Sequence, residues 1–231
     1  MSVYTPHLAP VVVLAFLGTG GLLVLCLFVA LVGALRKSRS VFLGAVGAGA
    51  IILVGYASML LGLSLVSRDV VIARGAWKYF CELDCHIAYT IGEVRFASSV
   101  GPEFQPVSPD GKFVIVELRA WFDPLTVSPH RGNGPLTPNG RLVSLVDERG
   151  RRFALSGKSG PVLAAAGLYS TPLETALRPG QTYVSIVVFE VPSDAKGLKL
   201  LLTSSDPEDF LIWGEENSPF HGKAYFSLPQ T

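Results

Sequence analysis

The residues with the clearest chemical potential stand together in the segment 77–86. Cys81 and Cys85 are separated by three residues, and His86 follows the second cysteine directly. The third cysteine, Cys26, lies in an apolar stretch, where the sequence predicts only a packing role. Two thiols and an imidazole can form a disulfide, hold a soft metal ion or attach haem, so the motif is compatible with several kinds of site.

A structural disulfide between Cys81 and Cys85 is the interpretation that the sequence favours. Two cysteines of an exported domain in an oxidising compartment usually pair. A bridge over so short a loop removes little entropy from the unfolded chain, so it would fix local geometry more than it would stabilise the fold. Thiol exchange at the same pair is a variant of this interpretation.

Two other interpretations of the Cys-x3-Cys-His motif stay open. Cys81, Cys85 and His86 could supply two thiolates and an imidazole to copper or zinc, if a further histidine joined them. The available histidines are His130 and His221. The chain has two methionines, one terminal and one in an apolar stretch, which counts against copper electron transfer. The motif is also a rare variant of the haem attachment sequence, with His86 as the proximal ligand.

Two long apolar stretches precede this motif and set its compartment. Residues 8–35 and 41–67 carry no charged side chain. A hydrocarbon core needs roughly 20 residues of helix, so the pair predicts a hairpin of two transmembrane helices over 1–67, with spans at about 8–35 and 41–67. The first stretch is far longer than the apolar core of a signal peptide, and no basic residue precedes it, so we expect both helices to be retained.

The orientation of the hairpin follows from its connector. Arg36, Lys37 and Arg39 stand within residues 36–40, and the tail 1–7 has no lysine or arginine. Short loops rich in such cations stay in the cytoplasm. The sequence therefore predicts a multi-pass protein of the cell membrane with both chain ends and the soluble domain outside the cytoplasm.

The apolar stretches predict an anchor rather than a transporter. Neither contains an acidic, basic or histidine side chain, which excludes a proton relay or an ion path. Small residues four apart, Gly44/Ala48 and Ala45/Gly49, allow helices to approach closely. This approach serves either packing within the hairpin or self-association of copies.

The rest of the chain reads as short strands. In one of them Glu117 and Arg119 share one face, while Val114, Val116 and Leu118 share the other. Strands are predicted at 87–95, 112–122, 141–147, 152–155, 183–191, 198–203, 210–213 and 224–228, with turns at 109–111, 139–140, 148–150 and 179–181 and one short helix at 161–168. This pattern predicts an all-β, immunoglobulin-like antiparallel sandwich over 86–231, preceded by a juxtamembrane segment at 68–85.

Two further segments stand out in the sandwich region. The proline-rich and glycine-rich segment 123–140 is longer than most connections, so it is a candidate binding loop with His130, Arg131 and Asn133. Acidic residues flank the predicted strand 210–213, which favours a solvated strand edge there. They are Glu208, Asp209, Glu215 and Glu216.

Three pieces of sequence, in order, resemble a known family. They are PDGKFVIV at 109–116, LVDERGRRF at 145–153, and LRPGQ at 177–181 followed by VVFEVP at 187–192. This order is similar to a telokin-like, immunoglobulin-like domain family of unknown function, found in exported and anchored bacterial proteins. The resemblance covers roughly 86–204 and implies a sandwich fold and export. It supplies no catalytic residues.

Composition narrows the function. The region 68–231 holds 16 Lys and Arg against 18 Asp and Glu, a formal charge of −2, which does not favour a nucleic-acid partner. No nucleophile motif such as Gly-x-Ser-x-Gly occurs, so we do not expect an enzyme. We expect a non-enzymatic, membrane-anchored module of the cell envelope, without a cofactor, that contacts the bilayer and binds another envelope component or its own copies. The alternative is a metal, haem or thiol-redox protein using Cys81, Cys85 and His86.

Metal analysis and an absorption spectrum of the purified protein separate these interpretations. For the disulfide we expect no stoichiometric metal and no Soret band, with Cys81 and Cys85 unreactive toward a thiol reagent until a reductant is added. Recovery of stoichiometric copper, zinc or haem would contradict it.

Overall fold

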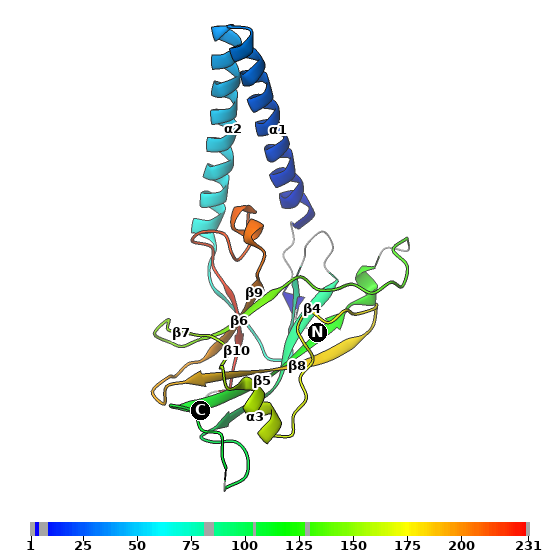
Figure 1. Ribbon diagram of the computed structural model, residues 1–231, viewed down its shortest axis with the longest axis vertical. Coiled ribbons are helices and arrows are strands. Elements are labelled where there is room, and N and C mark those ends of the chain that lie inside the picture. Colours follow the sequence, from blue (N-terminus) through cyan, green and yellow to red (C-terminus); the bar gives the residue numbers. More distant parts are fainter. Residues whose placement is uncertain (1–2, 5–8, 81–85, 104, 128–129, 230–231) are drawn as a thin grey trace. The chain divides into compact units, whose positions relative to one another are not determined.

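The computed structural model of the chain describes residues 3–4, 9–80, 86–103, 105–127 and 130–229 (Figure 1). In chain order the elements are β1 (Val3–Tyr4), α1 (Ala9–Leu35), α2 (Arg39–Val66), β2 (Val70–Ile72), β3 (Trp77–Phe80), β4 (Ile87–Ala97), β5 (Lys112–Phe122), the 3-10 helix η1 (Pro124–Thr126), β6 (Arg141–Val146), β7 (Arg152–Phe153), α3 (Ser159–Ala165), β8 (Thr182–Val191), β9 (Lys199–Ser204), the 3-10 helix η2 (Pro207–Leu211) and β10 (Ala224–Ser227). They form two compact units. One contains α1, α2 and the segment 207–222, and the other contains the strands.

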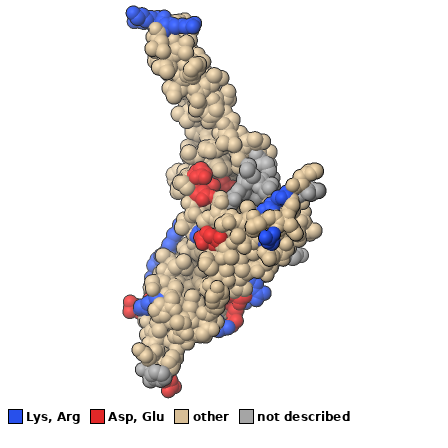
Figure 2. Space-filling view, turned by 45° about the vertical axis from the view of Figure 1, so that its right-hand side comes forward, with Lys and Arg blue, Asp and Glu red and all other residues tan. Residues whose placement is uncertain are grey.

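The helical unit confirms two long apolar helices at the predicted positions. Both are long and apolar enough to cross a membrane, by length and composition. Their side chains are mostly exposed, and Leu27, Leu35 and Ile51 are 71%, 75% and 75% accessible. The helices therefore differ from the core helices of a soluble domain, which bury such side chains. Figure 2 shows basic side chains gathered at the turn between the helices and an uncharged surface along the rest of this face of the hairpin.

The two small-residue pairs of α2 have different surroundings. Ala45 is buried, and a Cβ built on Gly49 would lie 3.5 Å from the Cβ of Cys26 in α1. Gly44 and Ala48 are exposed instead. The pair Ala45/Gly49 therefore serves the close packing of α1 on α2.

The strand unit contains two five-stranded sheets. Their orders are β1-β3-β4-β5-β8 and β2-β10-β9-β6-β7. Neighbours run antiparallel except for the pairs β1/β3 and β2/β10, which are parallel. Side chains of both sheets share one core, as a β-sandwich requires. The two parallel pairs are the departure from the predicted antiparallel sandwich.

The central strand β5 shows why these residues form this fold. Val114, Val116 and Leu118 alternate along it and are all fully buried in the core between the sheets, as their spacing predicted. Its opposite face is also covered at one end, where Phe113 packs with Val162 of α3. Figure 1 shows this short helix beside β8. It confirms the predicted helix, which begins at Ser159 rather than at position 161.

The structure differs from the predicted strands in three places. β1 lies in the N-terminal tail 1–7, where no strand was predicted. β2 and β3 fall in the segment 68–85 and were not predicted, because they are short and one of them buries the charged Lys78. The strand predicted at 210–213 is wrong. The chain there forms η2 and a turn, since Pro207 cannot donate to a strand ladder and Gly214 has φ +76°.

Gly111 tests the register of the central strands. A Cβ at this position would come within 2.2 Å of the Val191 carbonyl oxygen, where β5 begins beside the end of β8. Since this carbonyl oxygen belongs to the backbone and cannot rotate away, Gly111→Ala is expected to lower the free energy of unfolding by about 1–3 kcal/mol. Urea unfolding in detergent solution measures it.

Gly157→Ala is the matched control. No described atom lies within 4 Å of a Cβ built there. Its free energy of unfolding should stay within about 0.5 kcal/mol of the unaltered protein. Equal effects of the two substitutions would contradict the close approach at Gly111.

Candidate functional site

Five side chains meet at one end of the first sheet, and we call them the His86 cluster. They are Tyr79 of β3, His86 directly before β4, Phe122 at the end of β5, Asp123 between β5 and η1, and Thr126 of η1. Antiparallel pairing brings them together, because Phe80 pairs with Ile87 and Ile87 pairs with Phe122. The predicted cysteines belong to the connection between β3 and β4 and lie outside the described residues.

His86 is held in one orientation by its neighbours. The side chain is 3% exposed, and its ring stacks on Phe122 with centroids 5.3 Å apart. Its Nδ1 atom lies 2.6 Å from Thr126 Oγ1, and that hydroxyl donates its hydrogen to the Asp123 carbonyl oxygen at 2.9 Å. A hydroxyl has one hydrogen, so Nδ1 must donate to it. The Thr126 hydroxyl therefore fixes the orientation of the His86 ring through Nδ1.

Asp123 ties the cluster together. Its Oδ2 accepts a hydrogen bond of 2.5 Å from the Tyr79 hydroxyl, and its Oδ1 accepts one of 2.8 Å from the Leu125 N–H. The second bond caps η1, which presents Thr126 to His86. Burial raises the pKa of Tyr79, and the hydrogen bond and the charge of Asp123 raise it further, so this phenol stays protonated.

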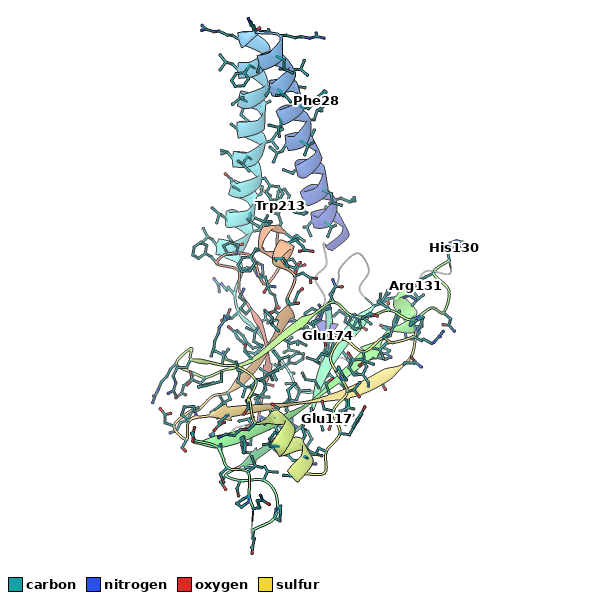
Figure 3. The ribbon with its side chains drawn as sticks, in the orientation of Figure 1. Phe28, Glu117, His130, Arg131, Glu174 and Trp213 are labelled. Atoms are coloured by element: carbon teal, nitrogen blue, oxygen red, sulfur yellow. The ribbon has the colours of Figure 1, made fainter. Side chains whose placement is uncertain are left out.

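The predicted binding loop is fixed onto the sandwich rather than loose. Arg131 Nη1 donates to the Gly134 carbonyl at 3.0 Å, and its guanidinium carbon lies 4.9 Å from the centre of the Phe122 ring. The Asn133 carbonyl accepts a bond of 3.0 Å from Arg178. His130 is exposed and lies at the outer end of the loop in Figure 3. Phe122 thus contacts both His86 and Arg131, so the structure joins two segments that the sequence predicted separately.

The metal interpretation finds no ready-made centre in this part of the chain. Among the described residues, no three His, Cys, Asp or Glu side chains are grouped to hold a metal ion. His130 projects on the loop, and His221 belongs to the segment 207–222 of the helical unit. The roles of Cys81, Cys85 and His86 in a disulfide, metal or haem site stay predictions.

Sequence reasoning missed most of the His86 cluster. Asp123 followed by proline is a turn signal, which could have indicated the cap of η1. No local signal marks Tyr79, because its partner is distant in the chain. Two buried cations were missed for the same reason. Lys78 donates to the Leu202 carbonyl at 2.7 Å, and the Arg141 guanidinium lies 4.3 Å from the centre of the Phe80 ring.

Comparison with known proteins identifies no family for this chain. No family model matches it, and no curated protein matches it. A conserved hypothetical protein from Bacillus anthracis has a TM-score of 0.38 and 19% identity over 51% of this chain and 82% of its own. The secreted protein MPT63 from Mycobacterium tuberculosis has a TM-score of 0.41 and 8% identity over 69% and 98%. The yjhA protein from Bacillus subtilis has a TM-score of 0.40 and 12% identity over 68% and 98%.

At these TM-scores and identities the three structures define neither a family nor a function for this chain. The similarity of its motifs to the telokin-like, immunoglobulin-like family therefore stays a resemblance.

Tyr79→Phe tests the link between β3 and Asp123. Because a buried carboxylate loses a donor, the free energy of unfolding at neutral pH should fall by about 1–3 kcal/mol. The unaltered protein should also lose stability as pH rises above about 10, since the unfolded phenol releases its proton there while folded Tyr79 retains it. The variant should lose stability less steeply over that range.

Urea unfolding at several pH values, followed by circular dichroism, makes the measurement. Tyr169→Phe is the control, because Tyr169 is 84% exposed. Matching pH profiles for Tyr79→Phe and the unaltered protein would contradict the raised pKa of Tyr79.

Proposed function

We propose that this chain is a non-enzymatic, membrane-anchored module of the cell envelope, with α1 and α2 crossing the bilayer. The observation that carries this proposal is the exposure of the apolar side chains along both helices. Contiguous apolar surfaces of this size are rare on soluble monomers, and a hydrocarbon environment removes their cost. The length of each helix suits the crossing.

The proposed orientation places the sandwich outside the cytoplasm. The turn between the helices holds Arg36, Lys37 and Arg39, so it is the end expected to stay in the cytoplasm. Both helices then emerge on the outer side, where the strands follow α2 in the chain. An oxidising outer compartment also suits a disulfide between Cys81 and Cys85.

The sandwich is proposed to act as a binding module of the telokin-like, immunoglobulin-like kind. Its candidate binding face is the loop that carries His130, Arg131 and Asn133, and the buried Phe122 of the His86 cluster supports that loop from below. This loop offers an exposed imidazole at His130 and a cation at Arg131. The stacking of Arg131 on Phe122 and the bond from Arg178 to the Asn133 carbonyl hold the loop on the sandwich. Such rigid presentation lowers the entropy lost on binding a protein or an envelope polymer.

A second candidate function is metal, haem or thiol chemistry at Cys81, Cys85 and His86. One observation favours it. His86 is 3% exposed, and Thr126 fixes the orientation of its ring through Nδ1, as outer hydrogen bonds do for metal-bound histidines.

Membrane extraction and a reporter test the proposed anchor and its orientation. We expect the chain to stay in the membrane pellet after alkaline carbonate treatment, and alkaline phosphatase fused after Thr231 to be active. Replacing Arg36, Lys37 and Arg39 by glutamine should lower the reporter activity, because the charge bias that sets the orientation is lost.

Removing the same charge from exposed positions of the sandwich is the control. Arg149, Arg152 and Lys196 are exposed, and their replacement by glutamine should leave the reporter activity unchanged. A soluble chain, or an inactive reporter on the unaltered protein, would contradict the proposal.

A further inference from the structure

The segment 207–222 is an unusual connection between two paired strands. β9 and β10 are antiparallel neighbours, with Leu201 opposite Tyr225, and such neighbours need only a few linking residues. Here the connection forms η2 and a series of turns, and it groups with the helices rather than with the strands on either side. No pattern in the sequence predicts this structure of the connection.

The segment is bound to α2 at two levels. Tyr56 of α2 donates from its hydroxyl to the Leu211 carbonyl at 2.5 Å, and Trp213 Nε1 donates to the Tyr56 carbonyl at 3.2 Å. The two rings lie 4.8 Å apart, and Figure 3 shows Trp213 beside α2. Further along the helix, the Gly222 N–H donates to Ser67 Oγ at 2.7 Å. The segment thus follows the last turns of α2.

The level of these contacts along α2 is informative. The helix begins at Arg39, beside the basic turn, and Tyr56 follows about 25 Å along its axis at a rise of about 1.5 Å per residue. Val66, the last residue, lies about 40 Å from Arg39 on the same scale. When the inner boundary of a hydrocarbon core about 30 Å thick is placed at Arg39, Tyr56 falls near the outer boundary and Ser67 lies on the outer side of it. The segment 207–222 therefore runs through the outer interface.

The side chains that the segment leaves uncovered suit that interface. Phe210, Leu211 and Phe220 are 55%, 52% and 76% exposed, although Ile212 of the same segment is buried. Phe220 also has a positive φ of 63°, which is unfavourable for a bulky residue. The Trp213–Tyr56 pair combines large rings with polar donors, the chemistry enriched where bilayers meet water.

The charges of the segment define the kind of lipid surface. Its charged residues are all acidic, namely Glu208, Asp209, Glu215 and Glu216, and it contains no lysine or arginine. Attraction to anionic headgroups is therefore not its driving force. The remaining contribution to membrane binding is the burial of aromatic and aliphatic side chains between the headgroups. This burial needs no particular headgroup charge.

We propose that the segment 207–222 is an interfacial membrane-contact element, which inserts Phe210, Leu211 and Phe220 into the outer leaflet around the Trp213–Tyr56 pair. Its partner is the lipid surface of the membrane that α1 and α2 cross. This inference rests on the proposed membrane anchor. It adds the connection between β9 and β10 to α1 and α2 as a third element in contact with lipid.

Fluorescence quenching of Trp213 in vesicles tests the proposal. The full chain with Trp77→Phe and Trp121→Phe retains Trp213 as its one tryptophan, and circular dichroism checks its fold. It is reconstituted in phosphatidylcholine vesicles with bromine near the headgroup or near the acyl-chain end. We expect strong quenching by the shallow label, weaker quenching by the deep label, and little quenching by aqueous iodide.

Two matched variants locate the effect. Adding Phe210→Ser and Phe220→Ser should remove most of the shallow quenching and increase quenching by iodide, because the inserted side chains are lost. Adding Leu125→Ser should change neither, since Leu125 is 90% exposed but belongs to η1 in the sandwich.

The outcomes separate this inference from the membrane anchor. Protein that floats with the vesicles but shows Trp213 open to iodide and unquenched by lipid would overturn the interfacial element and leave the anchor intact. Trp213 shielded from both quenchers would also overturn it, because protein rather than lipid would then cover the segment. Protein that does not float with vesicles would overturn the anchor and this inference together.

Discussion

Burial on both faces of the central strand β5 is the constraint on which the rest of the sandwich depends. Its inward side chains Val114, Val116 and Leu118 fill the core, while Phe113 on the opposite face is enclosed with α3. A slip of one residue would exchange these two sets of side chains, so the register against β4 and β8 is strongly fixed. The close approach at one end of β5 and the His86 cluster at the other end both follow from that register.

A polar contact between the sheets accompanies this apolar core. Lys78 is 2% exposed, and its ammonium reaches from β3 to the carbonyl oxygens of Leu202 in β9 and Ala224 in β10, at 2.7 and 3.3 Å. Hydrogen bonds to carbonyl dipoles compensate part of the cost of burying a charge. Neighbouring side chains of a strand point to opposite faces. Tyr79, the residue after Lys78, therefore lies on the other face of β3 and donates to Asp123. One short strand thus supports both the contact between the sheets and the candidate site.

The helical unit obeys a different constraint. Its apolar side chains are mostly exposed, and the proposed anchor would place them in lipid. The contacts of Trp213 and Ser67 show that this unit also includes residues from the far end of the sequence. The proposed anchor and the proposed interfacial element address the same physical problem, which is how exposed apolar surface is covered at successive depths of a bilayer.

Patterns local in the chain determined much of this protein. The absence of charge over 8–35 and 41–67 predicted the helices, and the alternation around Leu118 predicted the central strand with its inward face, because both signals depend only on neighbouring residues. The hydrogen bond between Tyr79 and Asp123, the burial of Lys78 and the docking of Trp213 on Tyr56 depend on partners from 44 to 157 residues away. The parallel pairs β1/β3 and β2/β10 also join distant segments. Only the tertiary structure decided these, since a side chain's partner across the fold leaves no periodicity in its own segment.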